Sequence, residues 1–356
     1  MSARQPSGER VWVGTYPRGG PEGEPGTGEG VWSVDRTREG ALSATLAAPS
    51  PAPSFLALSS DGAQLYAVGE TPSGTVARFT VSPDGDLTEV ERVASGGDGP
   101  CHLLLTDAAL YVANYSSGSV GVLTLDGTGA FSAEVVDAGG PVQVMQHDGS
   151  GPDADRQEGP HAHSTLRVGE VLLAADLGTD ELRRYRVRGD GRLSADGVAY
   201  RFEPGTGPRH MARGAGDHLY VVGELDARLH VLAWEPERGA LQEVQVLPAC
   251  RSPLTPGSTM LPAHIEARGA EVLLSVRGAD VIAHFAVHDD GARLAHVVDV
   301  SVGGGWPRHF ALLDDGLVVA VQNGGSVTLL DRRGRGVGVV IDHPACVVRA
   351  PHPLGG

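Results

Sequence analysis

The segment TVARFTV, residues 75–81, is a short apolar strand of alternating residues, and six similar segments recur along the chain. They read VWSVD at Val31, SVGVLTL at Ser119, ELRRYRV at Glu181, RLHVLAW at Arg228, VIAHFAV at Val281 and SVTLLD at Ser326. Their spacing is about 45 residues, stretched at two points by insertions, and such a period with several short strands per unit is typical of a β-propeller. The repeat predicts that the chemistry collects at one mouth of a central channel.

Each repeat resolves into four strands. The first follows a proline, as in PCHLLLT from Pro100, and the second ends in a polar residue, as in LYVAN at Asn114. The chain starts with a second-type strand, VWVGTY at Val11, and ends with a first-type strand, PACVVRAP from Pro344. We therefore expect an all-β, seven-bladed β-propeller with four antiparallel strands per blade. It forms one domain over residues 1–356, and its N- and C-terminal strands close the ring and remove an exposed sheet edge.

Charge limits the class of partner. The net charge of −16 disfavours nucleic acid and anionic membranes. No run of about 18 apolar residues exists, so we expect no membrane span. All 28 basic residues are arginine and none is lysine, which excludes Schiff-base chemistry and leaves arginine to recognise any anion.

The compartment is predicted from two features. The N-terminal stretch MSARQPSGER lacks the apolar region of a secretory signal. Cys101, Cys250 and Cys346 cannot all pair, and their spacing is not that of metal ligands. We therefore expect a reduced, cytoplasmic protein.

Functional candidates follow from the strand pattern, because the start of the first strand and the end of the second share one face of each blade. The positions there include Glu70, His102, Asn114, His161, His163, Asp176, Arg209, His210, Glu224, His264, Arg277, Arg308 and His309. Acids, bases and arginines gathered in this way suit acid–base chemistry on an anion. Four of the histidines (His102, His210, His264 and His309) share one register, two residues after the proline, and that regularity favours a packing role.

One segment interrupts the repeat. After a fourth strand expected near Phe131, an insertion over about residues 138–160 includes MQHDGSGPDADRQEGPHAH and has no apolar period. Long loops of this kind are often functional. His161 and His163 are two residues apart, but no carboxylate-rich ligand set accompanies them, so we expect no metal. The chain has neither a Gly-X-Ser-X-Gly elbow nor a glycine-rich nucleotide loop after a strand.

In this context the chain resembles the seven-bladed-propeller lactonases, which include propeller-type 6-phosphogluconolactonases and fungal-type carboxymuconate-lactonizing enzymes. The similar segments are VGTY at Val13, LYAVGE at Leu65, VANYSSGSV at Val112, HDGSGPDADRQEGPHAHS at His147, DLGTDELRRY at Asp176, GTGPRHM at Gly205, RGADVIAHF at Arg277 and PRHF at Pro307. They run in order over nearly the whole chain.

The resemblance implies a lactone-handling enzyme without a cofactor. Its proposed catalytic residues fall on His161 or His163, Arg209, Glu224 and Arg277, and the sequence does not decide between the two histidines. The other candidates, assigned to substrate binding, are Glu70, Asn114, Arg156, Gln157, Asp176, His210, Arg308 and His309.

Three functions stay open. The leading one is hydrolysis of a sugar-derived lactone, 6-phosphogluconolactone, by His-assisted attack of water with arginines stabilising the anion, which would place the protein in the pentose phosphate pathway of carbohydrate metabolism. The second is reversible lactonization of a muconate-type diacid, and the third is a non-catalytic binding platform. The expected partner is a small anionic lactone, and the oligomeric state stays open.

Overall fold

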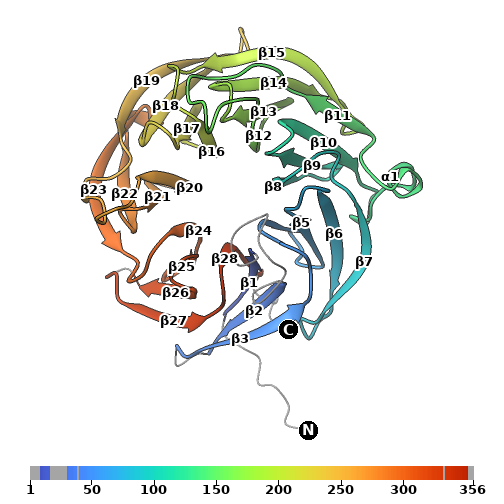
Figure 1. The fold of residues 1–356 in the computed structure, drawn as a ribbon, viewed down its shortest axis with the longest axis horizontal. Coiled ribbons are helices and arrows are strands. Elements are labelled where there is room, and N and C mark those ends of the chain that lie inside the picture. Colours follow the sequence, from blue (N-terminus) through green and yellow to red (C-terminus); the bar gives the residue numbers. More distant parts are fainter. Residues whose placement is uncertain (1–8, 17–29, 38–39, 332, 352–356) are drawn as a thin grey trace.

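The computed structural model describes residues 9–16, 30–37, 40–331 and 333–351, and most of them lie in β-strands. Residues 1–8, on which the expectation about secretion rests, lie outside this part. Seven four-stranded antiparallel sheets stand like blades around a central channel (Figure 1). The predicted seven-bladed β-propeller is therefore confirmed.

The 28 strands of the described residues divide evenly among the blades. Blade 1 holds β28 (Pro344–Arg349), β1 (Glu9–Thr15), β2 (Val31–Arg36) and β3 (Leu42–Ala48), and blade 2 holds β4 (Leu56–Leu58), β5 (Gln64–Gly69), β6 (Thr75–Val81) and β7 (Leu87–Ala94). Blade 3 holds β8 (Pro100–Leu105), β9 (Ala109–Asn114), β10 (Ser119–Thr124) and β11 (Gln143–Gln146), and blade 4 holds β12 (Ala162–Val168), β13 (Val171–Asp176), β14 (Glu181–Val187) and β15 (Leu193–Arg201). Blade 5 holds β16 (Pro208–Arg213), β17 (His218–Gly223), β18 (Arg228–Glu235) and β19 (Ala240–Pro248). Blade 6 holds β20 (Leu261–Arg268), β21 (Glu271–Arg277), β22 (Val281–His288) and β23 (Arg293–Ser301), and blade 7 holds β24 (Pro307–Leu312), β25 (Gly316–Val321), β26 (Ser326–Asp331) and β27 (Gly336–Val340).

The ends of the chain close the ring as predicted. Strand β28 pairs antiparallel with β1, with Val13 opposite Val347 and Gly14 opposite Cys346. Blade 1 is therefore built from both termini, and its inner strand, like that of every other blade, has a hydrogen-bonded neighbour.

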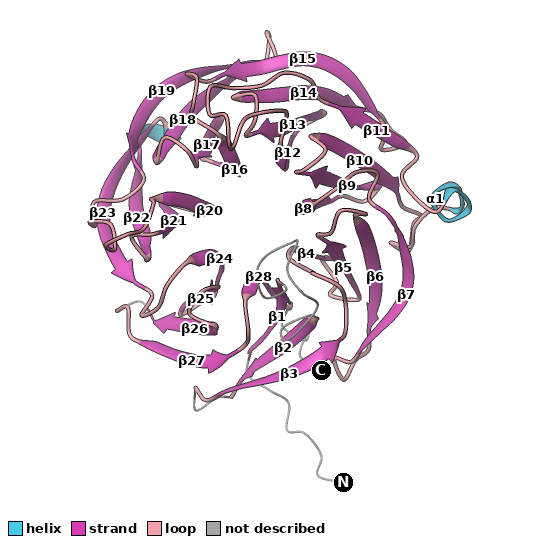
Figure 2. Ribbon diagram, in the orientation of Figure 1, coloured by secondary structure: helices cyan, strands magenta, loops and turns pink. Residues whose placement is uncertain are grey.

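The insertion differs from the prediction. The fourth strand of blade 3 is not near Phe131 but at β11, inside the range assigned to the loop, where Val120 lies opposite Met145. Phe131 is buried beside the short helix α1 (Ala133–Ala138), at the rim of the ring (Figure 2). The sequence prediction was wrong because β11 has only four residues, too few to display a clear alternation. The irregular loop is thus limited to residues 147–161.

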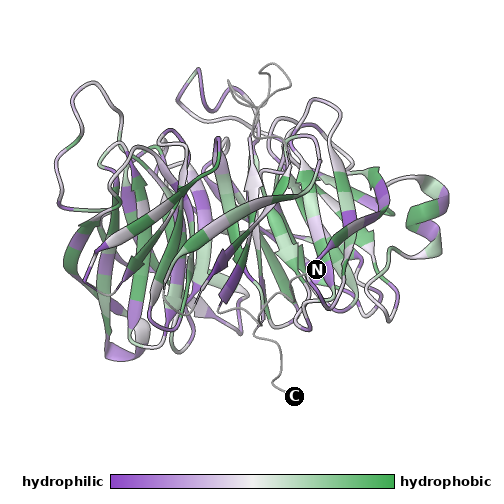
Figure 3. Cartoon of the chain, turned by 90° about the horizontal axis from the view of Figure 1, so that it is seen from below, coloured by the Kyte–Doolittle hydropathy of each residue, from purple (hydrophilic) through white to green (hydrophobic). Residues whose placement is uncertain are grey.

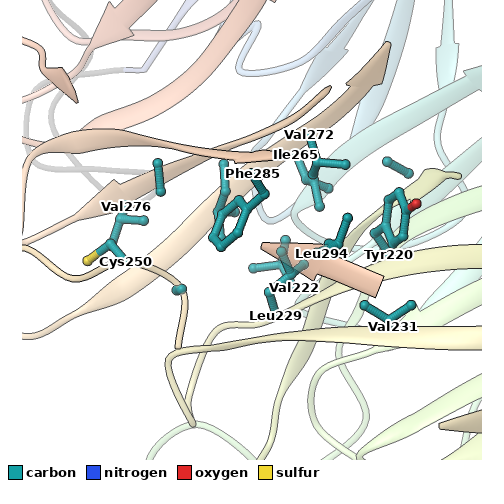
Figure 4. Close-up of a cluster of buried hydrophobic side chains, with 14 of the residues drawn as sticks. Tyr220, Val222, Leu229, Val231, Cys250, Ile265, Val272, Val276, Phe285 and Leu294 are labelled. Carbon is teal, nitrogen blue, oxygen red and sulfur yellow. The ribbon is translucent and has the colours of Figure 1, made fainter. Parts of the chain in front are cut away.

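The hydrophobic cores lie between neighbouring blades, because each sheet buries both faces against the next. The core between blades 5 and 6 joins Tyr220, Val222, Ile265 and Phe285 (Figure 4). Hydrophobic residues fill the strands within the ring, whereas polar residues concentrate in the loops at its two ends (Figure 3). None of the helices in the described residues is long and apolar enough to cross a membrane.

Candidate active site

The first strand of each blade is the innermost, so β8, β12, β16, β20, β24 and β28 surround the channel with β4 (Figure 2). In most blades the proline at the start of this strand pairs with the end of the second strand, as Pro208 does with Gly223. The residue after that proline then faces one layer of the channel. The residues at this register position, which we call the upper layer, are Ser54, Cys101, His163, Arg209, Ala263, Arg308 and Ala345.

Blade 4 is the exception, and it separates the two candidate histidines. There Ala162, not Pro160, takes the position of the proline, opposite Asp176. His163 consequently occupies the same register position as Arg209 and Arg308. His161 lies before the strand, with its ring stacked on Tyr115 at 4.4 Å between centroids.

A buried carboxylate holds three arginines together. Glu224 Oε2 accepts hydrogen bonds from Arg209 Nε at 2.7 Å and interacts with Arg277 Nη2 at 2.9 Å, and Oε1 accepts from Arg156 Nη2 at 2.6 Å. The Glu224, Arg209 and Arg277 side chains are all at most 5% exposed. Burial alone would raise the pKa of Glu224, but Arg277 and Arg209 hold it well below its ordinary value. Glu224 is therefore a permanent anion that orients guanidinium groups.

A second polar group lies on the opposite side of the channel, in blades 1, 2 and 7. Arg308 Nη2 donates to the Tyr16 hydroxyl at 2.7 Å, and that hydroxyl donates to Glu70 Oε1 at 2.5 Å. Ser54 donates to the other oxygen of Glu70. Burial raises the pKa of Glu70, although Arg308 opposes the shift.

The charge of Arg308 is not neutralised by direct pairing. Among the residues that the structure describes, no carboxylate lies within ion-pair distance of its guanidinium. Its neighbours are the Tyr16 hydroxyl and, at 3.5 Å, the side-chain oxygen of Gln322. Arg308 thus differs from Arg209, Arg277 and Arg156, which share Glu224, and it can accept an incoming anion.

The two histidines have different surroundings. His163 Nδ1 lies 3.9 Å from Cys101 Sγ, and burial together with Arg209 lowers the pKa of His163 well below its ordinary value. The His161 ring nitrogens lie 2.9 Å from the Tyr115 carbonyl oxygen and 3.3 Å from Glu158 Oε1. His163 is therefore a buried, neutral imidazole in the upper layer, and His161 is held by Tyr115 and Glu158.

The loop of residues 147–161 is tied at both ends to Asp176. Its Oδ2 lies 2.6 Å from His147 Nδ1, and its Oδ1 accepts from the backbone N–H of His161 at 2.8 Å. His147 Nε2 lies 2.7 Å from the Tyr185 hydroxyl. A side chain at Gly178 would collide with the Gly159 carbonyl, so this approach requires glycine.

Three predicted binding residues serve this architecture. Asp176 anchors the loop, Gln157 donates to the Leu177 carbonyl at 2.8 Å and Asn114 donates to the Ser95 carbonyl at 3.4 Å. Arg156, from the same loop, reaches Glu224 and so joins the site. We accordingly treat Asp176 and Gln157 as supports of the site, because their polar groups have protein partners, whereas the buried Oδ1 of Asn114 has no hydrogen-bond partner among the described residues.

Below the upper layer, aromatic rings fill the channel. This lower layer contains Phe55, His102, His210, His264 and His309, with centroids of His264 and His309 only 3.7 Å apart. Burial lowers the pKa of His102 to about 3 and those of His210 and His309 well below their ordinary values. The shared register of these histidines thus corresponds to packing across the channel.

A small cavity, with about 10 Å³ of space for the centre of a water molecule, lies where the two layers meet. It is lined by Ser54, Phe55, Glu70, Cys101, Arg209, His210, Arg308, His309 and Ala345. Of the predicted residues, Glu70, Arg209, His210, Arg308 and His309 line it directly. Ser54 and Cys101 were not predicted, although both follow a first-strand proline, as Arg209 does. Tyr115, which stacks on His161, was not predicted either.

No group of three or more histidine, cysteine, aspartate or glutamate side chains within the described part of the chain is arranged to hold a metal ion. The site offers instead a carboxylate-bound arginine cluster, a further arginine, a neutral histidine and a small cavity. These groups can bind an anion, stabilise a developing oxyanion and receive a proton.

The comparison with known families agrees with this chemistry. The family model described as lactonase, 7-bladed beta-propeller, matches residues 10–339. The chain belongs to this lactonase family. It is similar to a Bacillus subtilis protein named 6-phosphogluconolactonase, with 32% identity over 332 residues that cover 90% of each chain.

Solved structures show the same fold. A Pseudomonas aeruginosa protein described as a periplasmic gluconolactonase superposes with a TM-score of 0.82 at 25% identity, covering 97% of this lactonase-family chain and 99% of its own. A Lactobacillus plantarum protein superposes with a TM-score of 0.82 at 26% identity, covering 96% and 99%. The expected resemblance to propeller lactonases is confirmed.

Proposed function

We propose that this lactonase-family protein hydrolyses a sugar-derived lactone, 6-phosphogluconolactone, to the open-chain acid. The family and the relatives named 6-phosphogluconolactonase and gluconolactonase support a lactone substrate. The observation that supports an anionic substrate is that the Arg308 guanidinium lines the cavity and has no carboxylate partner among the described residues. A phosphate or carboxylate bound there would supply the missing negative charge.

In the proposed mechanism a water oxygen attacks the lactone carbonyl carbon. Because His163 Nδ1 lies beside Cys101, Nε2 is the nitrogen left to take the proton of the water. The carbonyl oxygen becomes an oxyanion, which Arg209 and Arg277 stabilise. Collapse of the tetrahedral intermediate breaks the bond to the ring oxygen, and the proton returns from His163 to that oxygen. Glu224 keeps both arginines in place.

The proposed substrate is tested by assaying the purified protein against 6-phosphogluconolactone and a muconolactone, with spontaneous hydrolysis subtracted from each rate. We expect enzymatic hydrolysis of 6-phosphogluconolactone that saturates with substrate and leaves the muconolactone unchanged. Activity confined to the muconolactone would overturn the proposed reaction, and activity on neither would favour a binding role.

We also propose that the protein acts in the cytoplasm, where this hydrolysis would belong to the pentose phosphate pathway. All three cysteines are buried and unpaired, which suits a reducing compartment. The test is cell fractionation, together with thiol titration of the denatured protein without reductant. We expect three thiols per chain, whereas one thiol would indicate a disulfide and an oxidising location.

A further inference from the structure

His210 contains a buried nitrogen without a partner. The side chain lines the cavity, and the residue is 5% exposed. Its Nδ1 lies 3.0 Å from His264 Nδ1, whereas Nε2 has no hydrogen-bond partner among the described residues. Buried polar atoms are usually satisfied, so an orphan nitrogen beside a cavity points to a ligand.

The neighbouring histidines have their tautomers set by the backbone. His102 Nδ1 accepts from the Thr165 N–H at 3.4 Å, and His309 Nδ1 accepts from the Val347 N–H at 3.5 Å. A neutral imidazole that accepts at Nδ1 carries its hydrogen on Nε2. His102 and His309 are therefore Nε2–H tautomers.

His210 must be the opposite tautomer. On the far side of the lower layer, His264 Nε2 lies 3.6 Å from the Glu266 carboxylate, which favours a hydrogen on that nitrogen. With its hydrogen on Nε2, the His264 imidazole has a lone pair on Nδ1 and accepts a hydrogen bond from His210 Nδ1. His210 thus keeps a bare lone pair on Nε2.

We propose that His210 Nε2 accepts a hydrogen bond from a hydroxyl group of the bound lactone, and that this contact selects polyhydroxylated sugar lactones. The inference rests on the proposed function and extends it to a specificity-determining residue. A buried acceptor left unpaired destabilises the complex. A sugar hydroxyl satisfies it, whereas a lactone without hydroxyls leaves it unpaired, which is the general basis on which a polar site rejects an apolar analogue.

The first experiment compares kcat/KM for glucono-δ-lactone and δ-valerolactone, which has the same ring without hydroxyls. In His210→Phe, which keeps an aromatic ring among Phe55 and its neighbours, we expect the preference for the hydroxylated lactone to fall roughly 10- to 100-fold. The control His218→Ala, on the same blade but at the far end of β17, leaves the ratio unchanged. An equal loss for both lactones overturns the proposal, because the partner of Nε2 would then be the attacking water.

The second experiment needs neither activity nor a stable His210 variant. In protein labelled with nitrogen-15 at histidine, we expect the His210 Nε2 resonance in the range of an unprotonated imidazole nitrogen, and gluconate but not pentanoate should shift it. Glu266→Gln removes the carboxylate that favours a hydrogen on His264 Nε2. It should therefore raise the fraction of His210 that carries its hydrogen on Nε2. A protonated Nε2 in the unaltered protein, or no response to gluconate, overturns the inference. If His210 Nε2 responds to gluconate as expected but the protein does not hydrolyse the lactone, only the proposed function is overturned.

Discussion

Arg209 and Arg277 point their guanidinium groups at one and the same carboxylate oxygen, Oε2 of Glu224, from neighbouring blades. Two cations held close together would repel, so the carboxylate between them makes the pair possible in a buried site. The arrangement presents two fixed positive charges without requiring reorganisation when negative charge develops on a substrate.

Substitution of Arg209 or Arg277 by alanine should therefore remove stabilisation of the transition state. We expect a loss of about 2–4 kcal/mol, which corresponds to roughly a 30- to 1000-fold decrease in kcat for lactone hydrolysis. His218→Ala is the matched control, because His218 begins β17 whereas Glu224 follows its end. Unchanged hydrolysis in both arginine variants, with activity abolished in His218→Ala, would place the active site at the other face.

The two histidines should differ in their effect on the pH–rate profile. Since the pKa of His163 is lowered well below 6.5, the wild-type rate should stay constant as the pH falls from 8 through 6.5. His163→Ala should lower kcat at every pH and flatten any decline at more acid pH. His161→Ala should affect mainly KM, because His161 packs on Tyr115 in the wall. Rates measured from pH 4.5 to 8 test this, and equal losses of kcat in both variants would contradict it.

The buried histidines should make stability depend on pH. His102, His163, His210 and His309 all have folded pKa values below the unfolded value near 6.5, so the unfolded chain binds more protons in this range. Their contribution is present above pH 6.5 and is lost as the pH falls towards the folded values, about 3 for His102. Each group adds a slope of up to about 1.4 kcal/mol per pH unit.

Urea unfolding at pH 7.5, 6.5 and 5.5 measures this slope. We expect the free energy of unfolding to drop steeply only below pH 6.5. The slope reports the number of protons taken up on unfolding, and His309→Phe should reduce that number by about one. His230 acts in the opposite sense: burial would lower its pKa, but Asp226 and Glu243 raise it, so its contribution is lost at higher pH. Stability that did not change between pH 6.5 and 5.5 would mean that the lower-layer histidines are solvated.

Removal of the C-terminal strand should open the ring. Deleting residues 345–356 takes away most of β28, which pairs with β1 from Val11 to Thr15 and buries Cys346 and Val347. The innermost edge of blade 1 would then be exposed, and we expect a lowered melting temperature and aggregation.

The control for this truncation ends the chain at Pro351, after the last residue of β28. It should melt like the full-length protein. If the shorter protein did so as well, ring closure through β28 would not be needed for stability.

Much of the fold was predictable because blade formation is local. Strands such as TVARFTV, with turn residues between them, specify a four-stranded sheet from contiguous sequence. Strand β11 was missed since its four residues carry too short a pattern. Only the set of candidate site residues was predictable, because first-strand starts and second-strand ends share a face in any propeller. Which of these residues contact one another was not.

The sequence by itself determined the seven-bladed ring, its closure by both termini, and the set of ionisable residues at one mouth. Only the tertiary structure decided which of them meet. It placed His163 rather than His161 in the register of Arg209, because the strand of blade 4 begins two residues after Pro160. In the tertiary structure three arginines pair with Glu224, whereas Arg308 has no carboxylate partner in the described residues. His210 Nε2 likewise has no hydrogen-bond partner there. These contacts join side chains about 15 to 70 positions apart and depend on distances that no local pattern encodes.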